Sequence, residues 1–348
     1  MNPWLRRKLD RLRKVWLLPL VSASLAIPVM LQMEMAGSTN NVSHSEPVLV
    51  ASPLALDQIQ EIIPLGNLNP AGGHVFPADH IYFDYGQKAG LTVFAPAGGT
   101  VRSVRTQSRG DLKIEVQVDP NVDYYLAHID VEPEFKVGSK VMPGQRLGTV
   151  SGRSMLDLGT TDARVRVSGL TDPSRYPEPT LHATSPLSLF SEPLKKQLYA
   201  KVRRTGPDKD GRFDLDRRGR LVGNWFHQSL SVKGSSRGEP QVWARQLAFA
   251  YDVLDPQRVR VSVGGTVGPA GIYAVTGNGP DPAEVRVESG RVLYRLTRIG
   301  SARSSGPWPD QGILLVQLLN ETRLRAEHLA DFRQEPRGFS EKATVYER

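Results

Sequence analysis

The chain has 348 residues, enough for two domains, and its 32 glycines and 26 prolines suit a turn-rich β protein better than a helical bundle. Six Lys and Arg side chains fall within residues 1–14, so the remaining sequence carries little of the +8 net charge and has no basic footprint for nucleic acid. The absence of cysteine excludes disulfides, lipid attachment through cysteine and thiolate metal sites, so a metal would need His, Asp or Glu ligands.

The N-terminal segment has the features of an export signal. An apolar run at residues 15–31 follows the basic residues and precedes small residues at 36–38. Two prolines interrupt this run, and its length of about 17 residues is at the short limit for a membrane-spanning helix. We predict a signal peptide or membrane anchor at residues 1–35 and a polar linker at 36–58. Either form of the segment places the rest of the chain outside the cytoplasm, and membrane contact is expected only through this anchor.

Residues 59–190 contain short β-type segments separated by turns. Between residues 112 and 118, aliphatic side chains alternate strictly with charged or polar ones, as in a strand with one buried face. Glycines mark the corners of a strand–turn–strand unit at 136–152. The pattern predicts an N-terminal domain built on an antiparallel β-sheet.

A second β-rich region spans residues 197–348. Turn signals recur there about every ten residues between predicted strands, one of them at residues 241–254, which favours an antiparallel β sandwich or barrel. The stretch 190–202 is a helix or a linker, and we place the domain boundary at 191–196. The predicted fold is therefore mainly β, and the role of the C-terminal domain is not indicated.

The stretch HVFPADHIYFDYG, residues 74–86, is the richest in chemically capable side chains. His80 and Asp84 form an H-x-x-x-D pair, which could reach one cation from an irregular strand, and zinc accepts both types of ligand. The alternative is a hydrogen-bonded pair beneath a sheet. His74 either adds a further ligand, because the loop could curl back at its glycines, or is a structural histidine bonded to a backbone carbonyl.

Three later segments extend this pattern: APAGGTV at 95–101, YYLAHID at 124–130 and KVGSKVMPGQRLGTVSG at 136–152. Together they resemble the lysostaphin-type zinc endopeptidases, an exported, peptidoglycan-cleaving family with a small β-sheet domain, over roughly residues 65–190. The resemblance implies zinc as cofactor, with His80 and Asp84 as ligands. It implies His128 as a catalytic histidine that assists the zinc-bound water, and peptidoglycan or an envelope protein as partner.

The family's closing His-x-His motif, which gives a second catalytic histidine and a third ligand, is missing. Residues 154–167 contain no histidine, and Asp157 is the nearest side chain there that could ligate a metal. A catalytic zinc needs three protein ligands, and losing one positioned acid or base costs about 10²–10⁴-fold in rate. We therefore expect an exported cell-envelope protein with a degenerate metallopeptidase-like domain that binds peptidoglycan or peptide, or regulates another envelope enzyme. The alternative is an active zinc endopeptidase with His74 or Asp157 as an atypical third ligand.

Two local features have alternative interpretations. His128 either lines a groove or is a satisfied core residue, because its neighbours on the predicted strand are apolar. Tyr124 and Tyr125 either line a groove for sugar or peptide stems or belong to the core.

Overall fold

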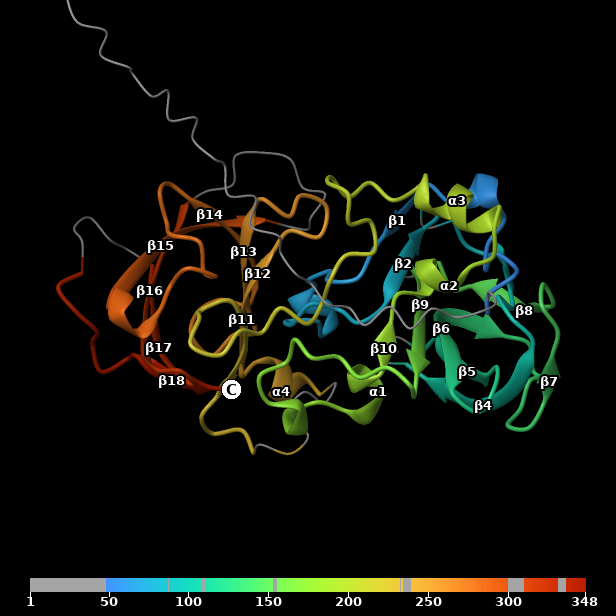
Figure 1. Cartoon of the computed structure of the whole chain (residues 1–348), viewed down its shortest axis with the longest axis horizontal. Helices are drawn as coiled ribbons and strands as arrows, with labels where there is room; N and C mark the ends of the chain where they lie inside the picture. Colours follow the sequence, from blue (N-terminus) through green and yellow to red (C-terminus); the bar gives the residue numbers. More distant parts are fainter. Residues whose placement is uncertain are drawn as a thin grey trace, which may run out of the picture. The chain divides into compact units, whose positions relative to one another are not determined.

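An antiparallel sheet and then a closed barrel follow each other along the chain (Figure 1). The computed structural model describes residues 48–86, 88–107, 110–152, 155–231, 233, 239–299, 310–330 and 336–348. The predicted signal or anchor at residues 1–35 and most of the predicted linker lie outside these residues. Within the described ranges, no helix is both long and apolar enough to cross a membrane.

The sheet has ten strands among the described residues, in the order β1-β2-β9-β6-β5-β4-β7. β3 pairs with β8, β8 also pairs with β6, and β10 pairs with β9; every one of these pairings is antiparallel. The predicted antiparallel sheet is confirmed. Its strands are β1 Glu61–Ile63, β2 Ile81–Asp84, β3 Thr92–Phe94, β4 Gly99–Thr106, β5 Leu112–Gln117, β6 Val122–Val131, β7 Lys140–Val141, β8 Arg146–Val150, β9 Leu156–Asp162 and β10 Ala183–Thr184.

The alternating sequence of β5 explains how the sheet builds its core. Ile114 and Val116 are fully buried, whereas Lys113, before them, and Glu115, between them, are only half-buried. This period of two is the one that the sequence predicts for a strand with one covered face. The buried side chains join a single cluster with others from β2, β6, β8 and β9.

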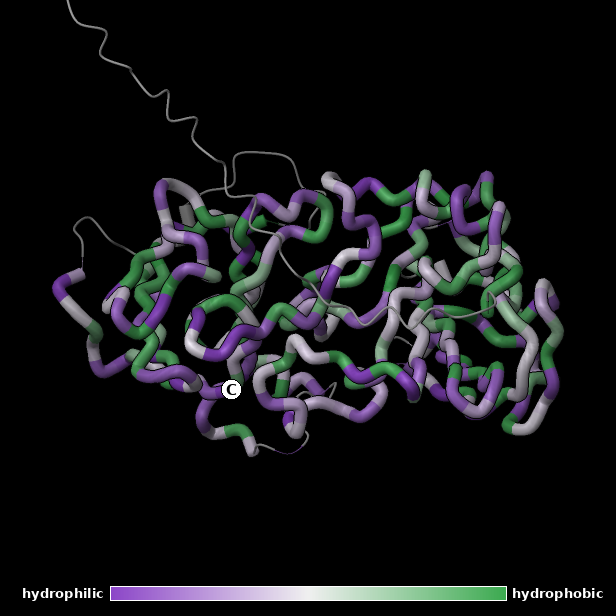
Figure 2. The backbone as a smooth tube through the Cα atoms, in the orientation of Figure 1, coloured by the Kyte–Doolittle hydropathy of each residue, from purple (hydrophilic) through white to green (hydrophobic). Residues whose placement is uncertain are grey.

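Eight further strands close into a barrel, in the order in which they occur in the described sequence. This confirms the second predicted β structure as a barrel. Aromatic and aliphatic side chains fill its interior, Trp225, Phe249 and Tyr294 among them, and hydrophobic residues follow the strands in Figure 2. The strands are β11 Gly223–His227, β12 Gln246–Tyr251, β13 Val259–Val263, β14 Gly271–Thr276, β15 Arg291–Ile299, β16 Asp310–Asn320, β17 Arg323–Leu329 and β18 Thr344–Glu347.

Short helices fill the connections. The segment predicted as helix or linker contains α3, Leu194–Tyr199, whereas α4 replaces the start of a strand predicted at 241–254. Pro240 explains the difference, because proline suits the first turn of a helix and lacks the N–H that a strand ladder needs. The other helices are α1 Glu178–Leu181, α2 Pro186–Leu189 and the 3₁₀ turns Leu56–Gln58, Pro70–Gly72, Pro173–Arg175 and Val287–Ser289.

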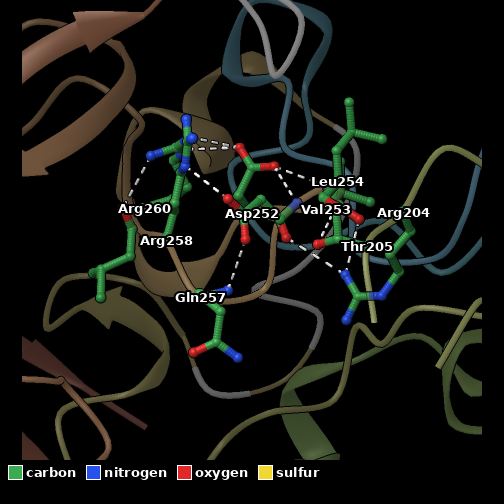
Figure 3. A network of polar contacts seen from close by, with 10 residues as sticks. Arg204, Thr205, Asp252, Val253, Leu254, Gln257, Arg258 and Arg260 are labelled. Atoms are coloured by element: carbon green, nitrogen blue, oxygen red, sulfur yellow. Dashed lines mark hydrogen bonds and ion pairs between the residues drawn. The ribbon is translucent and has the colours of Figure 1, made fainter. Parts of the chain in front are cut away.

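Apolar and polar contacts join barrel residues to the sheet and its loops. Val253 packs with Ile63 and Tyr82, and the ring of Phe226 meets that of Phe76 edge-on at 4.9 Å. Figure 3 shows the polar part of this junction, where Arg204 donates to the carbonyl oxygen of Val253 at 2.8 Å. The adjacent carboxylate of Asp252 accepts from Arg260 Nε at 2.8 Å and from the backbone N–H of Leu254 at 2.8 Å. These bonds hold the segment after α3 against the β12–β13 turn.

Candidate functional site

A cavity of about 420 Å³ opens where β2, β9 and β6 lie side by side. Both flanking strands align with β9 at the same residue, because Tyr82 and Ala127 are each paired with Asp157. This register brings side chains from three distant parts of the sequence into one lining. The titratable lining residues from the sheet and from the loop before β2 are His74, Asp79, His80, Lys113, Tyr125, His128 and Asp157.

His80 enters the cavity at the residue that precedes β2. Its Nδ1 lies 3.1 Å from Oδ1 of Asp79, and the other oxygen of Asp79 accepts from the hydroxyl of Thr180 at 2.7 Å. Asp79 therefore fixes the imidazole from one side, and α1, which contains Thr180, fixes Asp79. The ring of Tyr82 packs 4.8 Å from that of His80 and holds it from the strand side.

His128 owes its position to a bulge in β6. Ala127 is the last residue of β6 paired with β9, and Ile129 is the first paired with β8. His128 lies between these two pairings, where the register with β5 also shifts, and its φ is 66°. Among the described residues it is the one non-glycine with positive φ. Such a conformation costs of order 1–3 kcal/mol and is typical of functional sites.

Asp157 lies on β9 between the two imidazoles. Its Oδ2 is 3.5 Å from Nε2 of His80 and 3.3 Å from Nε2 of His128. Nδ1 of His128 lies 2.9 Å from Oδ2 of Asp111, a fully buried carboxylate at the start of β5. The five side chains thus form an alternating series of acid and imidazole, from Asp111 through His128, Asp157 and His80 to Asp79.

The acids and imidazoles of this series stabilise one another's charged forms. Burial alone lowers the pKa of His80, but Asp157 and Asp79 outweigh it and raise that pKa to about 9. For His128, Asp157 and Asp111 likewise overcome the effect of burial and raise the pKa to about 9. Burial works in the opposite direction on Asp157, yet the two imidazoles hold its pKa well below its ordinary value. At neutral pH both imidazoles are therefore cationic and Asp157 is their shared anion.

His74 and Asp84 take different places. His74 lines the cavity, with its ring edge-on to that of His80 at a centroid distance of 5.1 Å. Burial, followed by repulsion from His80, lowers the pKa of His74 to about 4, so it is neutral at pH 7. Asp84 is buried outside the cavity lining, and its Oδ1 accepts from the backbone N–H of Gly86 at 2.9 Å. The structure therefore brings four of the five predicted site residues together and leaves Asp84 apart.

These residues do not fit the zinc centre that the resemblance implies. Asp84, the expected second ligand, is engaged with its own turn and does not face the cavity. Within the described ranges, no group of three or more His, Asp or Glu side chains is arranged to hold a metal ion. The contacts of 3.3 and 3.5 Å join Asp157 to the two imidazoles as charged partners.

Several residues of the site have no local sequence signal. Asp111 appears only as a polar residue before a strand, although full burial of a carboxylate demands a partner. The barrel residues Asn224, Trp243 and Gln246 line the cavity, although even Asn224 lies about 140 residues after the stretch 74–86. Nothing local in the sequence links them to the sheet.

Comparisons with known proteins find similarity to solved structures only. No family model and no curated protein matches the sequence. The chain is similar to Csd3 of Helicobacter pylori, at 19% identity, covering 35% of this chain and 34% of that one with a TM-score of 0.28. It is similar to a zinc-containing peptidase from Vibrio cholerae, at 19% identity, 35% and 39% coverage and a TM-score of 0.29. It is similar to lysostaphin at 12% identity, covering 72% of this chain and 87% of that one with a TM-score of 0.30.

The chain spans little more than a third of the length of the first two of these proteins. At these identities the similarity concerns the fold alone. Function is therefore inferred from the geometry of the site itself.

Proposed function

We propose that this chain is an exported cell-envelope protein that binds peptidoglycan, or peptide derived from it, at a peptidase-like site without zinc-dependent hydrolysis. The observation that carries the proposal is the position of Asp157 between His80 and His128. A side chain predicted as a third ligand thereby acts as counter-ion to two imidazolium groups. Regulation of another envelope enzyme would also depend on peptidoglycan or peptide bound at this site.

The charge state of the site supports binding rather than hydrolysis. A general base must be able to accept a proton, and a pKa near the working pH serves this role best. With pKa values of about 9, His80 and His128 already carry their protons at neutral pH. They are therefore suited to donate hydrogen bonds to a ligand, and unsuited to activate water.

The competing hypothesis is a zinc endopeptidase that uses Asp157 as atypical third ligand. Two ligand atoms of a tetrahedral zinc, each bonded at about 2.0–2.1 Å, lie roughly 3.3 Å apart. The distances from Asp157 Oδ2 to His128 Nε2 (3.3 Å) and to His80 Nε2 (3.5 Å) are each close to this value. Taken together, the described side chains do not form a three-ligand group. Direct measurement of zinc decides between these hypotheses.

The test uses the purified full chain. We expect less than 0.1 equivalent of zinc after dialysis, no release of fragments from peptidoglycan, and co-sedimentation with insoluble peptidoglycan. The variant with both His80→Gln and His128→Gln should lose at least tenfold in sedimentation affinity. His182→Gln is the matched control, because His182 bonds to Val165 and Glu178 outside the cavity lining. One equivalent of zinc that survives dialysis, together with fragment release, would establish the endopeptidase instead.

A further inference from the structure

We infer that the cavity takes a saccharide, with one sugar hydroxyl seated among His80, His128 and Asp157 and the ring lying against Trp243 of the barrel. This inference rests on the proposed function and deepens it, because it selects the glycan of an envelope ligand over its peptide. It also gives the barrel a part in the binding site.

Two buried polar atoms in the cavity wall point to a ligand group. Among the described residues, Nε2 of His80 and Oδ1 of Asp157 have no hydrogen-bond partner, although the two residues are only 4% and 5% exposed. The 3.5 Å between His80 Nε2 and Asp157 Oδ2 exceeds the usual N–H···O distance of about 2.7–3.2 Å. Buried polar atoms are nearly always paired in native proteins. A group bound between the two residues would satisfy both.

The chemistry of these two atoms defines that group. Asp157 can only accept a hydrogen bond, whereas His80 has a carboxylate oxygen beside each of its ring nitrogens, an arrangement in which Nε2 donates. Because both atoms belong to side chains that approach within 3.5 Å, one ligand atom between them must donate and accept at the same time. A hydroxyl oxygen does this. An amide does not, because its donor is on nitrogen and its acceptor on oxygen.

The charged side chains around the cavity nearly balance one another. Three carboxylates, those of Asp79, Asp111 and Asp157, face the two imidazoles of His80 and His128. Both oxygens of Asp79 are already engaged, by His80 and by Thr180. Lys113 also lines the cavity, so three cationic side chains stand against three carboxylates, and this balance favours a neutral molecule that carries hydroxyl groups.

Trp243 supplies an aromatic wall that is built into the fold. A Cβ added to Gly73 would lie 2.3 Å from the Trp243 ring, and one added to Gly264 would lie 1.8 Å from the Trp243 carbonyl oxygen. Two glycines thus allow the half-buried indole to approach the loop before β2. Tyr125 is less available, because Lys113 Nζ covers its ring at 3.6 Å from the centroid. A sugar ring, with apolar faces and polar edges, matches an indole face beside a hydroxyl-binding cluster.

The size of the cavity limits the ligand. Its volume of about 420 Å³ is near the lower end of the roughly 300–1,000 Å³ of small-molecule sites. One or two sugar rings would fill it. A longer glycan would bind through one such unit and extend into solvent.

Calorimetry with the full chain tests the inference, with N-acetylglucosamine trisaccharide as one probe and trialanine as the other, each with and without EDTA. We expect saturable binding of the trisaccharide that EDTA leaves unchanged, and no binding of trialanine. Trp243→Ala and Asp157→Leu should each weaken trisaccharide binding at least tenfold, whereas Trp243→Phe, which keeps a flat ring, should weaken it less than threefold. Gln241→Ala, an exposed neighbour outside the cavity lining, should bind like the unchanged protein.

Thermal unfolding of each variant shows whether it still folds. If Asp157→Leu does not fold, the comparison of Trp243→Ala with Trp243→Phe still tests the inference. Trialanine binding that is weakened by the same variants would overturn the saccharide inference while leaving the proposed function intact. If the trisaccharide binds but Trp243→Ala has no effect, the barrel has no part in the site. If neither probe binds and the chain holds one equivalent of zinc, the inference and the proposed function both fail.

Discussion

Nε2 of His128 and Oδ2 of Asp157 face each other across two paired strands at 3.3 Å. The pairing of Ala127 with Asp157 sets this contact, and the bulge at His128 turns the imidazole toward its partner. A local irregularity in β6 thus places a side chain that a regular strand would direct elsewhere. The same carboxylate also faces His80, so Asp157 is the centre of the site's electrostatics.

The first prediction concerns the charge of Asp157. Replacement of Asp157 by Asn should leave two imidazolium groups without their shared anion. We expect the pKa of both His80 and His128 to fall from about 9, and stability at pH 7 to fall by about 3–5 kcal/mol, as for other broken buried ion pairs. NMR titration of the imidazole resonances and urea unfolding measure the two effects. Unchanged histidine pKa values would show that Asp157 does not set them.

The backbone at His128 gives a second prediction. Glycine adopts positive φ freely and alanine does not, so His128→Gly should be more stable than His128→Ala by about 1–2 kcal/mol. Both variants lose the imidazole, so their difference reports on the backbone alone. His182 has a φ of −114°, and there the glycine variant should be no more stable than the alanine variant. Equal stability of the two His128 variants in urea unfolding would contradict positive φ at this residue.

The third prediction separates backbone strain from the contact with Trp243. Gly73 and Gly138 have φ values of 94° and 90°, but a Cβ at Gly138 has no atom within 4 Å in the described structure. Alanine at Gly138 should cost about 1–2 kcal/mol from strain alone. Alanine at Gly73 should cost about 1–3 kcal/mol more, because it meets the indole ring. This excess should disappear in a Trp243→Ala background, as a double-mutant cycle of unfolding free energies would show.

The barrel contains a buried ion pair that gives a fourth prediction. Arg348 Nη1 lies 2.7 Å from Oδ1 of Asp216, and its guanidinium covers the ring of Trp225 at 3.8 Å. Arg348→Ala should cost about 3–5 kcal/mol, because it leaves a buried carboxylate unpaired. Arg218→Ala removes an exposed partner of Glu321 and should cost less than about 1 kcal/mol. A loss at Arg348 no larger than that at Arg218 would mean that Asp216 finds another partner or a proton.

Sequence patterns predicted the mainly β fold because alternation and turn chemistry are local signals. The strict period at residues 112–118 corresponds to β5, and the turn spacing after residue 197 corresponds to the barrel. The prediction extended a strand through residues 241–245, where Pro240 begins α4 instead. In such a short stretch the preferences for helix and strand are similar, so Pro240 at the first turn determines that a helix forms.

The candidate site was only partly predictable, because spacing shows which residues can be near each other but not which way they face. H-x-x-x-D spacing singled out His80 and Asp84, and strand register then placed Asp157, not Asp84, beside His80. Neither the bulge that orients His128 nor the barrel wall at Trp243 has a local sequence signal. Long-range pairing creates both.

The last prediction is the pH dependence of stability that the site produces. The folded-state pKa of His80 and His128 is about 9, above the ordinary 6.5, so their contribution is complete below pH 6.5 and is lost as the pH rises through 9. For Asp79, burial is outweighed by bonds to His80 and Thr180, which lower the pKa to about 2. Its contribution is present above pH 3.8 and is lost as the pH falls through 2. Together these shifts predict a constant contribution from His80, His128 and Asp79 between about pH 4 and 6.5, whereas His74, whose pKa is lowered to about 4, loses stability as the pH falls through that range.

The variant with both His80→Gln and His128→Gln isolates this effect. Each shift from 6.5 to about 9 corresponds to at most about 3 kcal/mol, and the two are not additive because Asp157 is shared. Subtraction of the variant's unfolding free energy from that of the unchanged chain should give a difference that is constant from pH 4.5 to 6.5 and decreases toward pH 9.5. His182→Gln should give a difference without this decrease. A difference that grows with pH would mean that the imidazoles are neutral in the folded protein, and Asp157 would then need another counter-ion.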